Sequence, residues 1–277
     1  MLHFSADALV LRAVARDEHD KLLTLLSADY GRFYAVVKGA HSARRREIGS
    51  FEPYTFGNFE LGGGGSVKWV RNATTLEAFG GLRYDPEKLF LAAYIADVAY
   101  DLSGEREPAH EMLSLTLNTL HRISEAKGSL GLIKAAFEMR AAAISGFCPE
   151  LSGCGRCGAP VGDSICLDVM NGSFLCGDCL HRASLAYSRE VDELGERNVL
   201  CPLDASAAAA LAYVVRADAK RIFSFSLTDP VSVDLFCRAA EAYLLHHLER
   251  TFVTLENYKK MQITHSSVTK ENTARGI

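Results

Sequence analysis

The sequence contains no apolar run of membrane-spanning length and none of the short motifs typical of common enzyme classes. A helix that crosses a bilayer needs about 20 apolar residues, and the alanine-rich stretch 205–215 is too short. There is no Gly-x-x-x-x-Gly-Lys-Ser/Thr loop, no His-Glu-x-x-His, and no His-x-Glu before Pro-Cys-x-x-Cys. We therefore expect no membrane association, no enzymatic activity and no small-molecule substrate.

A secretory signal is also missing, because the first residues lack a basic start followed by an apolar run. Eight cysteines without such a signal favour a reducing compartment over disulfide bonds, so we expect a cytoplasmic protein. The net charge of −4 shows no general basicity that would indicate a nucleic-acid partner. Residues 1–80, however, carry ten basic and nine acidic groups, and 259–277 carry four and one, so both ends are more basic than the middle.

Four of the cysteines form two Cys-x-x-Cys pairs, Cys154/Cys157 and Cys176/Cys179, with eighteen residues between the pairs. This spacing suits one tetrahedral Zn²⁺ ion, and the glycine-rich, apolar segment between the pairs is typical of the hairpin of a zinc ribbon. Four thiolates close the coordination shell, so the predicted zinc is structural. Disulfides and a thioredoxin-like redox motif are the alternatives. Cys148 and Cys166 lie near the pairs, and either could substitute for a ligand, although neither has a partner at ligand spacing.

Apolar patterning predicts an α+β chain. Short strands at 5–12, 31–38, 54–61, 67–71 and 74–79 indicate a small β-barrel, whereas 20–26 fits a strand or one helical turn. Helices are expected at 87–102, from Pro108, at 129–145, at 204–217 and at 230–258. The predicted organisation is thus a barrel at 1–82, a helical domain at 83–258 that contains the zinc module (about 148–182), and a disordered basic tail at 259–277.

Barrels of this type bind single strands by stacking bases on aromatic rings and by contacting phosphates with Lys and Arg. The barrel's candidate DNA-binding residues are its basic ones: Arg32, Lys38, Arg44, Arg45, Arg46, Lys68 and Arg71. Aromatic residues, including Trp69, alternate with them, and about half of these must face the core. A solvated loop is the alternative interpretation for the Arg44–Arg46 run.

Three stretches in this order, 8–12, 18–26 and 31–40, resemble the N-terminal barrel of the RecO family of bacterial DNA repair proteins. The segment 37–46 resembles the Lys-Gly-Ala stretch of that family with its basic continuation. The helical middle, the positions of the cysteine pairs and the last helix are similar too, so the resemblance covers about residues 1–258.

The resemblance implies an oligonucleotide-binding (OB-fold) barrel at the N-terminus, followed by a helical domain that carries a zinc module. It implies a nucleoid-associated, non-enzymatic recombination mediator that binds single- and double-stranded DNA and anneals complementary strands. It also implies action with RecR in loading recombinase on DNA coated by single-strand-binding protein (SSB). The matching positions are Lys38, Arg44, Arg45 and Arg46 for DNA, and the four paired cysteines for metal.

Two other function classes remain as alternatives. The first is a zinc-stapled protein-interaction module without direct DNA binding, in which the acidic helices would contact a basic partner. The second is a zinc-dependent enzyme, which would need an open coordination position on the metal.

Overall fold

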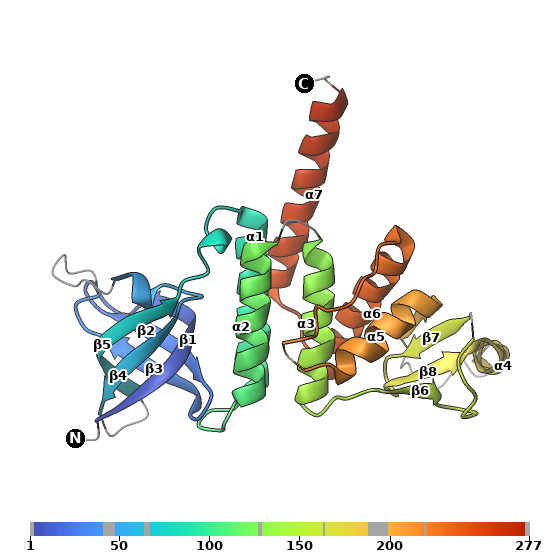
Figure 1. Cartoon of the computed structure of the whole chain (residues 1–277), viewed down its shortest axis with the longest axis horizontal. Helices are drawn as coiled ribbons and strands as arrows, with labels where there is room; N and C mark the ends of the chain where they lie inside the picture. Colours follow the sequence, from blue (N-terminus) through green and yellow to red (C-terminus); the bar gives the residue numbers. More distant parts are fainter. Residues whose placement is uncertain are drawn as a thin grey trace. The chain divides into compact units, whose positions relative to one another are not determined.

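Two compact units make up the computed structural model of the chain, which describes residues 3–40, 48–63, 67–126, 129–162, 164–187, 199–218 and 220–274 (Figure 1). The first unit comprises Met1–Leu130 and Phe252–Ile277, and the second comprises Gly131–Thr251. The barrel therefore shares a compact unit with helices from both ends of the helical region. The sequence analysis instead placed the boundary after residue 82, where the predicted strands give way to predicted helices.

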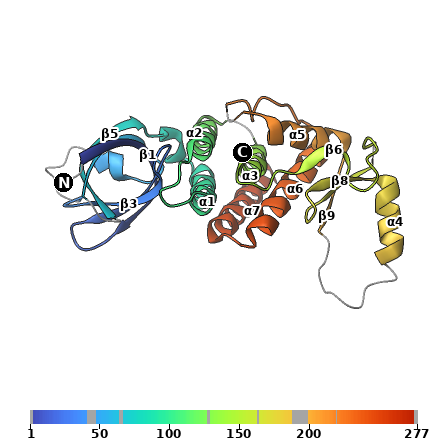
Figure 2. The ribbon, with the colours of Figure 1, turned by 90° about the horizontal axis from the view of Figure 1, so that it is seen from below.

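Five strands form the N-terminal barrel (Figures 1 and 2). They are β1 (His3–Ala15), β2 (Lys21–Ser27), β3 (Gly31–Val37), β4 (Phe56–Gly62) and β5 (Val67–Glu77). The strand order is β1-β2-β3-β5-β4, and β4 pairs with β1 to close the barrel. The β3–β5 pair is parallel and the other pairs are antiparallel. Two short 3₁₀ helices, η1 (Ile48–Phe51) and η2 (Gly80–Leu82), flank β4 and β5.

The number of barrel strands agrees with the sequence prediction, but two assignments differ. The segment 20–26, left open between strand and helix, contains most of β2, whereas the separate strands predicted at 67–71 and 74–79 belong to one long strand, β5. Strand β5 is long because it has two partners: its first residues pair with β3, and Trp69 onward pairs with β4. A register shift opposite Glu60 and Leu61 lets the strand bend from one partner to the other.

The barrel interior is filled by alternating strand residues that are small or aliphatic, together with a few phenylalanines. The core cluster contains Ala6, Ala8, Val10, Leu23, Leu25, Phe33, Ala35, Val37, Ala40, Phe51, Phe59, Leu61, Val70 and Ala73. The two-residue periodicity sends intervening side chains such as Asp7 outward. Burial of this apolar surface is the main stabilising contribution to a closed barrel of this size.

Helices α1 (Pro86–Leu102), α2 (His110–Glu125) and α7 (Val253–Ala274) complete the first unit. Helix α1 begins at the N-cap Asp85, whose side chain accepts hydrogen bonds from the backbone N–H groups of the first turn. The predicted helices at 87–102 and from Pro108 are thus present. Helices α1 and α7 pack against each other, and the rings of Tyr94 and Phe252 meet edge to face with centroids 5.5 Å apart.

The prediction of one helix over 230–258 was wrong, because the chain forms two helices there, α6 (Pro230–Leu248) and α7. Glu249 adopts a left-handed conformation (φ 49°) that ends α6. Phe252, which is 4% exposed, then anchors the start of α7 beside Tyr94. The disordered tail expected at 259–277 is instead helical as far as Ala274.

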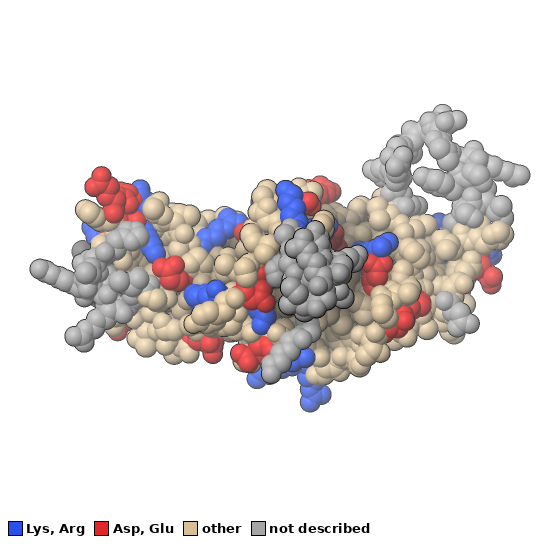
Figure 3. All heavy atoms as spheres, turned by 90° about the horizontal axis from the view of Figure 1, so that it is seen from above, with Lys and Arg blue, Asp and Glu red and all other residues tan. Residues whose placement is uncertain are grey.

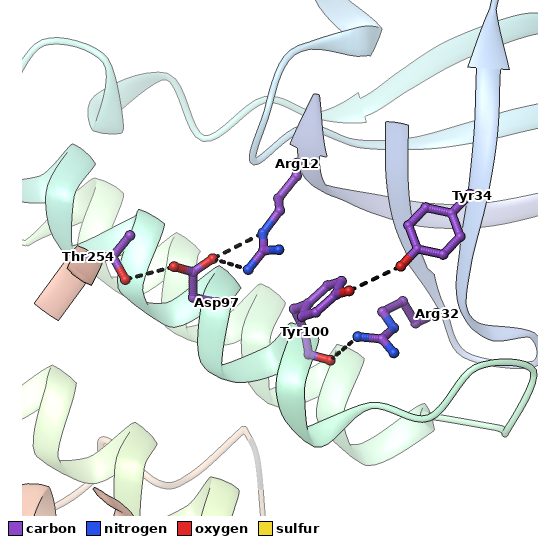
Figure 4. Close-up of polar contacts among 6 residues, drawn as sticks. All are labelled: Arg12, Arg32, Tyr34, Asp97, Tyr100 and Thr254. Carbon is purple, nitrogen blue, oxygen red and sulfur yellow. Dashed lines mark hydrogen bonds and ion pairs between the residues drawn. The ribbon is translucent and has the colours of Figure 1, made fainter. Parts of the chain in front are cut away.

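A polar joint holds the barrel against α1 (Figure 4). Arg12 of β1 donates to Asp97 of α1 at 2.6 Å, and Thr254 of α7 donates to the other oxygen of the same carboxylate at 2.8 Å. One turn further along α1, the guanidinium groups of Arg12 and Arg32 lie 4.1 Å and 3.8 Å from the ring centroid of Tyr100. Asp97 therefore links a barrel strand to two helices.

The second unit contains most of α3 (Leu130–Ile144) and all of α4 (Gly177–Tyr187), α5 (Ala205–Arg216) and α6. Its sheet has the order β6-β8-β7-β9, formed by β6 (Glu150–Cys154), β7 (Ile165–Asp168), β8 (Ser173–Cys176) and β9 (Leu200–Leu203). Lys134 of α3 bridges Glu138 at 2.8 Å and Glu241 of α6 at 2.9 Å. Lys134 and Glu138 are buried and Glu241 is half-buried, so this triad joins α3 to α6. No helix within the described ranges is long and apolar enough to span a bilayer.

Replacing Asp97 by alanine should lower the free energy of unfolding of the first unit by about 1–2 kcal/mol, because Arg12 and Thr254 lose their shared acceptor. Denaturant titration followed by the fluorescence of Trp69, the chain's one tryptophan, measures this. Asp29→Ala is the control, since the Asp29–His110 pair is 75% and 64% exposed and should contribute less than about 0.5 kcal/mol. Equal losses in the two variants would contradict the role given to Asp97.

Candidate nucleic-acid interface and metal centre

The four paired cysteines come together in the second unit. The sulfur atoms of Cys154, Cys157, Cys176 and Cys179 all lie within 4.8 Å of one another, and the Cys157 and Cys176 sulfurs are 3.8 Å apart. A tetrahedral ion with Zn–S bonds of about 2.3 Å places its sulfurs about 3.8 Å apart. The donor set and its dimensions therefore fit one four-coordinate metal ion of the zinc type.

Local backbone structure positions these sulfurs. Cys154 ends β6 and Cys157 follows in a tight turn, closed by hydrogen bonds from Gly158 N to Cys154 O (2.8 Å) and from Cys154 N to Ala159 O (2.9 Å). Glycine is required at position 155, because a β-carbon there would lie 2.4 Å from the hydroxyl of Ser173. The second pair spans the end of β8 and the first turn of α4.

The surroundings of the cluster act in opposite directions on the pKa values of Cys154 and Cys179. Burial raises the pKa of the Cys154 thiol, but hydrogen bonds from the backbone N–H groups of Cys176, Cys157 and Arg156 outweigh it, and the pKa falls to about 6. Burial and the neighbouring sulfurs raise the pKa of Cys179 to about 12. Cys154 is thus readily held as a thiolate, whereas Cys179 ionises readily only with a cation beside it, which a divalent metal supplies.

The predicted hairpin between the cysteine pairs is present as β7 and β8, which pair antiparallel from Ile165 to Asp168. Strand β9 pairs on the other side of β7 and was missed, because its short Leu-Cys-Pro-Leu sequence has no alternation. Cys166, which the sequence left open as a substitute ligand, is buried within the module but is not one of the four clustered residues. Cys148 is exposed and also lies outside that group.

Aromatic packing attaches the segment just before β6, which leads into the four-cysteine module, to α6. Tyr243 donates a hydrogen bond to the carbonyl of Phe147 (3.1 Å), and the rings of Phe147 and His247 stack with centroids 5.2 Å apart. Burial, with a smaller contribution from neighbouring His246, lowers the pKa of His247 below its ordinary value. His247 is therefore neutral in the folded chain at neutral pH.

Two of the basic candidates on the barrel lie close to aromatic rings, and a third lies on the same strand as one of these rings. Lys38 is exposed at the end of β3, and its amino nitrogen lies 4.4 Å from the ring centroid of Trp69. Arg71 is exposed two residues beyond Trp69 on β5. Lys68 is half-buried, with its amino nitrogen 5.8 Å from the ring centroid of Phe4. The side chain of Arg71 lies beside Gly62, which pairs with Trp69 across the strands. We call the exposed residues Lys38, Trp69 and Arg71 the Trp69 patch.

Arg32 is placed differently from the other candidates. Its guanidinium donates to the carbonyl of Tyr100 (2.9 Å), stacks on the ring of that residue and pairs with Glu105 at 3.7 Å. Only 16% of the side chain is exposed. Arg32 therefore serves the joint between the barrel and α1, and we do not include it in the Trp69 patch.

The Arg44, Arg45 and Arg46 run lies outside the described residues, so the structure places none of these three side chains.

The contact between Phe4 and Tyr30, whose ring centroids are 4.9 Å apart, was not found from the sequence. Tyr30 stands in the turn before β3 with only an Asp-Tyr-Gly context, which gives no periodic signal. Figure 3 shows one face of the molecule, on which basic and acidic side chains are interspersed among neutral ones.

The fold and the cysteine cluster define a class of protein: a five-stranded barrel followed by a helical region with an inserted four-cysteine metal module. Residues 1–79 match the family described as Recombination protein O N terminal, and residues 83–256 match Recombination protein O C terminal. The chain belongs to the RecO family, as the sequence resemblance indicated.

Relatives cover nearly the whole chain. The DNA repair protein RecO of Desulforudis audaxviator is 33% identical over 269 residues, which is 96% of this chain and 100% of the relative. The DNA repair protein RecO of Acetivibrio thermocellus is 27% identical over 261 residues, which is 94% of this chain and 98% of that relative. The similarity therefore includes the barrel, the helices and the metal module together.

Purified protein should contain one equivalent of zinc per chain, and Cys154→Ser or Cys179→Ser should remove most of it, because both ligands are buried in the cluster. Metal analysis measures the stoichiometry, and the cobalt-substituted protein should show the absorption of a tetrahedral four-thiolate site. Cys148→Ser is the matched control and should keep the metal, since Cys148 is exposed and outside the cluster. A water-ligated cobalt spectrum would contradict the closed site.

The second unit should lose stability as the pH falls below about 6.5. The pKa of His247 is lower in the folded chain than in the unfolded chain, so below about pH 6.5 the unfolded chain binds more protons. The free energy of unfolding therefore falls as the pH drops through this range, and above it His247 makes no contribution to the pH dependence. His247→Phe should remove this part of the pH dependence, as measured by thermal unfolding at several pH values. His121→Gln, an exposed change on α2, should keep the wild-type profile.

Proposed function

We propose that the chain is a DNA-binding mediator of recombinational repair without enzymatic activity. In this proposal it binds single- and double-stranded DNA through the barrel and anneals complementary strands. It also helps RecR load recombinase on DNA coated by SSB, and it works in the cytoplasm in association with the nucleoid. The observation that carries the proposal is membership of the RecO family over both the barrel and the helical region.

The barrel supports DNA binding through its topology. A closed five-stranded barrel in which β1 pairs with both β2 and β4, and β3 pairs in parallel with β5, has the strand order of an OB-fold. We therefore assign the N-terminal 82 residues to that fold. OB-folds bind oligonucleotides across the barrel surface and its loops.

The Trp69 patch supplies cations that the fold does not use. Within the described part of the chain, neither Lys38 nor Arg71 forms an ion pair or a hydrogen bond, in contrast to Arg12 and Arg32. Such cations can displace the counterions of a phosphate backbone, which favours binding even on a chain of net charge −4. The Arg44–Arg46 run follows Lys38 in sequence and is proposed to extend this surface.

Annealing follows from the same electrostatics. Two complementary strands repel each other through their phosphates, and a cationic surface that contacts both strands lowers that repulsion. No covalent chemistry is required, so the proposed role needs no catalytic group. The four-cysteine site is proposed to hold one structural Zn²⁺, because four thiolates would leave no open position for a substrate.

Fluorescence-monitored annealing of two complementary oligonucleotides over a salt series tests the function. Acceleration that weakens as salt increases is expected, because phosphate contacts release counterions. If the protein neither accelerates annealing nor binds an oligonucleotide at low salt, the DNA-binding proposal fails. In that case a zinc-stapled protein-interaction module would be the better description of the chain.

The double variant Lys38→Ala/Arg71→Ala should bind single-stranded DNA more weakly and with a flatter salt dependence. Each lost phosphate contact should reduce the slope of log K against log salt by about 0.7, as measured by fluorescence anisotropy of a labelled oligonucleotide. Arg122→Ala is the control, because Arg122 is an exposed cation on α2 rather than on the barrel. A wild-type slope in the double variant would exclude these two cations from the binding surface.

A further inference from the structure

Trp69 is unusual among the aromatic residues of the barrel strands because so much of it is exposed. Its side chain is 40% exposed, whereas Phe33 is 7% exposed and Phe59 is fully buried. It lies near the start of β5, opposite Gly62 of β4 and Val36 of β3. A large aromatic ring on the outside of a strand contributes little to the barrel core. Single exposed apolar side chains are common on protein surfaces, so a role for Trp69 depends on the groups around it.

The neighbouring outer face of β3 is not available to a ligand. Arg32 and Tyr34 both point to α1, where Arg32 stacks on the ring of Tyr100 and the Tyr34 hydroxyl lies 3.1 Å from the Tyr100 hydroxyl (Figure 4). The helix therefore covers a part of the barrel surface on which OB-folds often bind nucleic acid. The side chains of the Trp69 patch, in contrast, are exposed and are not covered by α1.

Two glycines leave room around the patch. A β-carbon at position 63 would lie 3.1 Å from Cδ1 of Trp69, and one at position 62 would lie 3.2 Å from Nε of Arg71. Because both positions carry only backbone, the indole and the guanidinium can lie close against the end of β4. The indole thus lies close to the end of β4, and 40% of Trp69 stays exposed with the ammonium of Lys38 over its ring.

We propose that Trp69 is a stacking platform for a base of single-stranded DNA, with Lys38 and Arg71 contacting the phosphates that flank that base. This inference rests on the proposed DNA-binding function and specifies which surface carries it. Base stacking on an aromatic ring is available to any base, and it adds to the phosphate contacts without requiring a particular sequence.

Lys38 has a further part in this arrangement. In the protein alone its ammonium group lies over the indole ring, in a contact that is weak at an exposed site. An arriving base competes for the ring, and its phosphate attracts the displaced ammonium. The exchange replaces one weak contact by a stacked base and a charge-assisted phosphate contact.

The platform distinguishes single strands from duplexes. The bases of a duplex are already stacked and paired inside the helix, so a duplex contacts Lys38 and Arg71 but offers no face to Trp69. During annealing, a base that leaves the indole to pair with a complementary strand loses this contact. The paired product should therefore be bound less tightly than the single strands that formed it.

Because Trp69 is the chain's one tryptophan, its intrinsic fluorescence reports on this site alone. Titration with an oligothymidylate should quench the emission, since a stacked base quenches an indole. An abasic oligonucleotide of the same length and a duplex should bind, as shown by anisotropy of a labelled strand, without comparable quenching. These two ligands supply phosphates but no free base, which separates stacking from electrostatic binding.

Variants at position 69 give a second measurement. Trp69→Ala and Trp69→Leu should weaken oligothymidylate binding roughly ten-fold, in the range of one lost stacking contact, and should leave abasic binding unchanged. Trp69→Phe should be intermediate because it retains a smaller ring. Leu76→Ala is the matched control, because Leu76 is an apolar residue of the same strand that is 53% exposed, and it should bind as wild type.

The outcomes separate this inference from the proposed function. Quenching by the oligothymidylate alone, together with the ten-fold loss in Trp69→Ala, would support the platform. Normal oligothymidylate binding without quenching, with Trp69→Ala unchanged, would overturn the platform but leave DNA binding intact. No binding of any of the three ligands would overturn the proposed function and the platform with it.

Discussion

Two guanidinium groups share the ring of Tyr100, and the first unit depends on this contact. Arg12 comes from β1 and Arg32 from β3, so the single ring on α1 holds two barrel strands at once. Asp97, one turn earlier on the helix, accepts hydrogen bonds from Arg12 and from Thr254 of α7. The barrel is thus attached to the helices by charged and aromatic groups as well as by apolar packing, which fixes its orientation on α1.

This joint also decides which basic residues remain for a ligand. The cations that serve it are held by ring and carboxylate contacts and are poorly placed to meet a phosphate. Within the described residues, Lys38 and Arg71 of the Trp69 patch form no ion pair or hydrogen bond, and Lys38 contacts the ring of Trp69. The position of α1 therefore divides the basic side chains of the barrel into structural ones and accessible ones, although nothing in their local sequence distinguishes the two groups.

Spacing within the sequence was enough to predict the metal module, because both cysteine pairs and the hairpin between them are local features. The barrel could also be predicted, but β5 could not, since its polar middle at Arg71 and Asn72 resembles a turn until its two partner strands are known. The role of Arg32 depends on Tyr100, 68 residues away, and so had no local signal. The end of α6 at Glu249 also had no signal in the apolar pattern, which continues from Leu248 to Phe252.

The path of the chain through its two units has a consequence for synthesis on the ribosome. The chain leaves the first unit after α2 and returns to it only at Phe252, so α7 is translated after the whole second unit. Until then Asp97 lacks Thr254, and the face of α1 around Tyr94 is uncovered. The first unit can therefore reach its final packing only after the second unit has emerged, although the barrel strands are translated earlier.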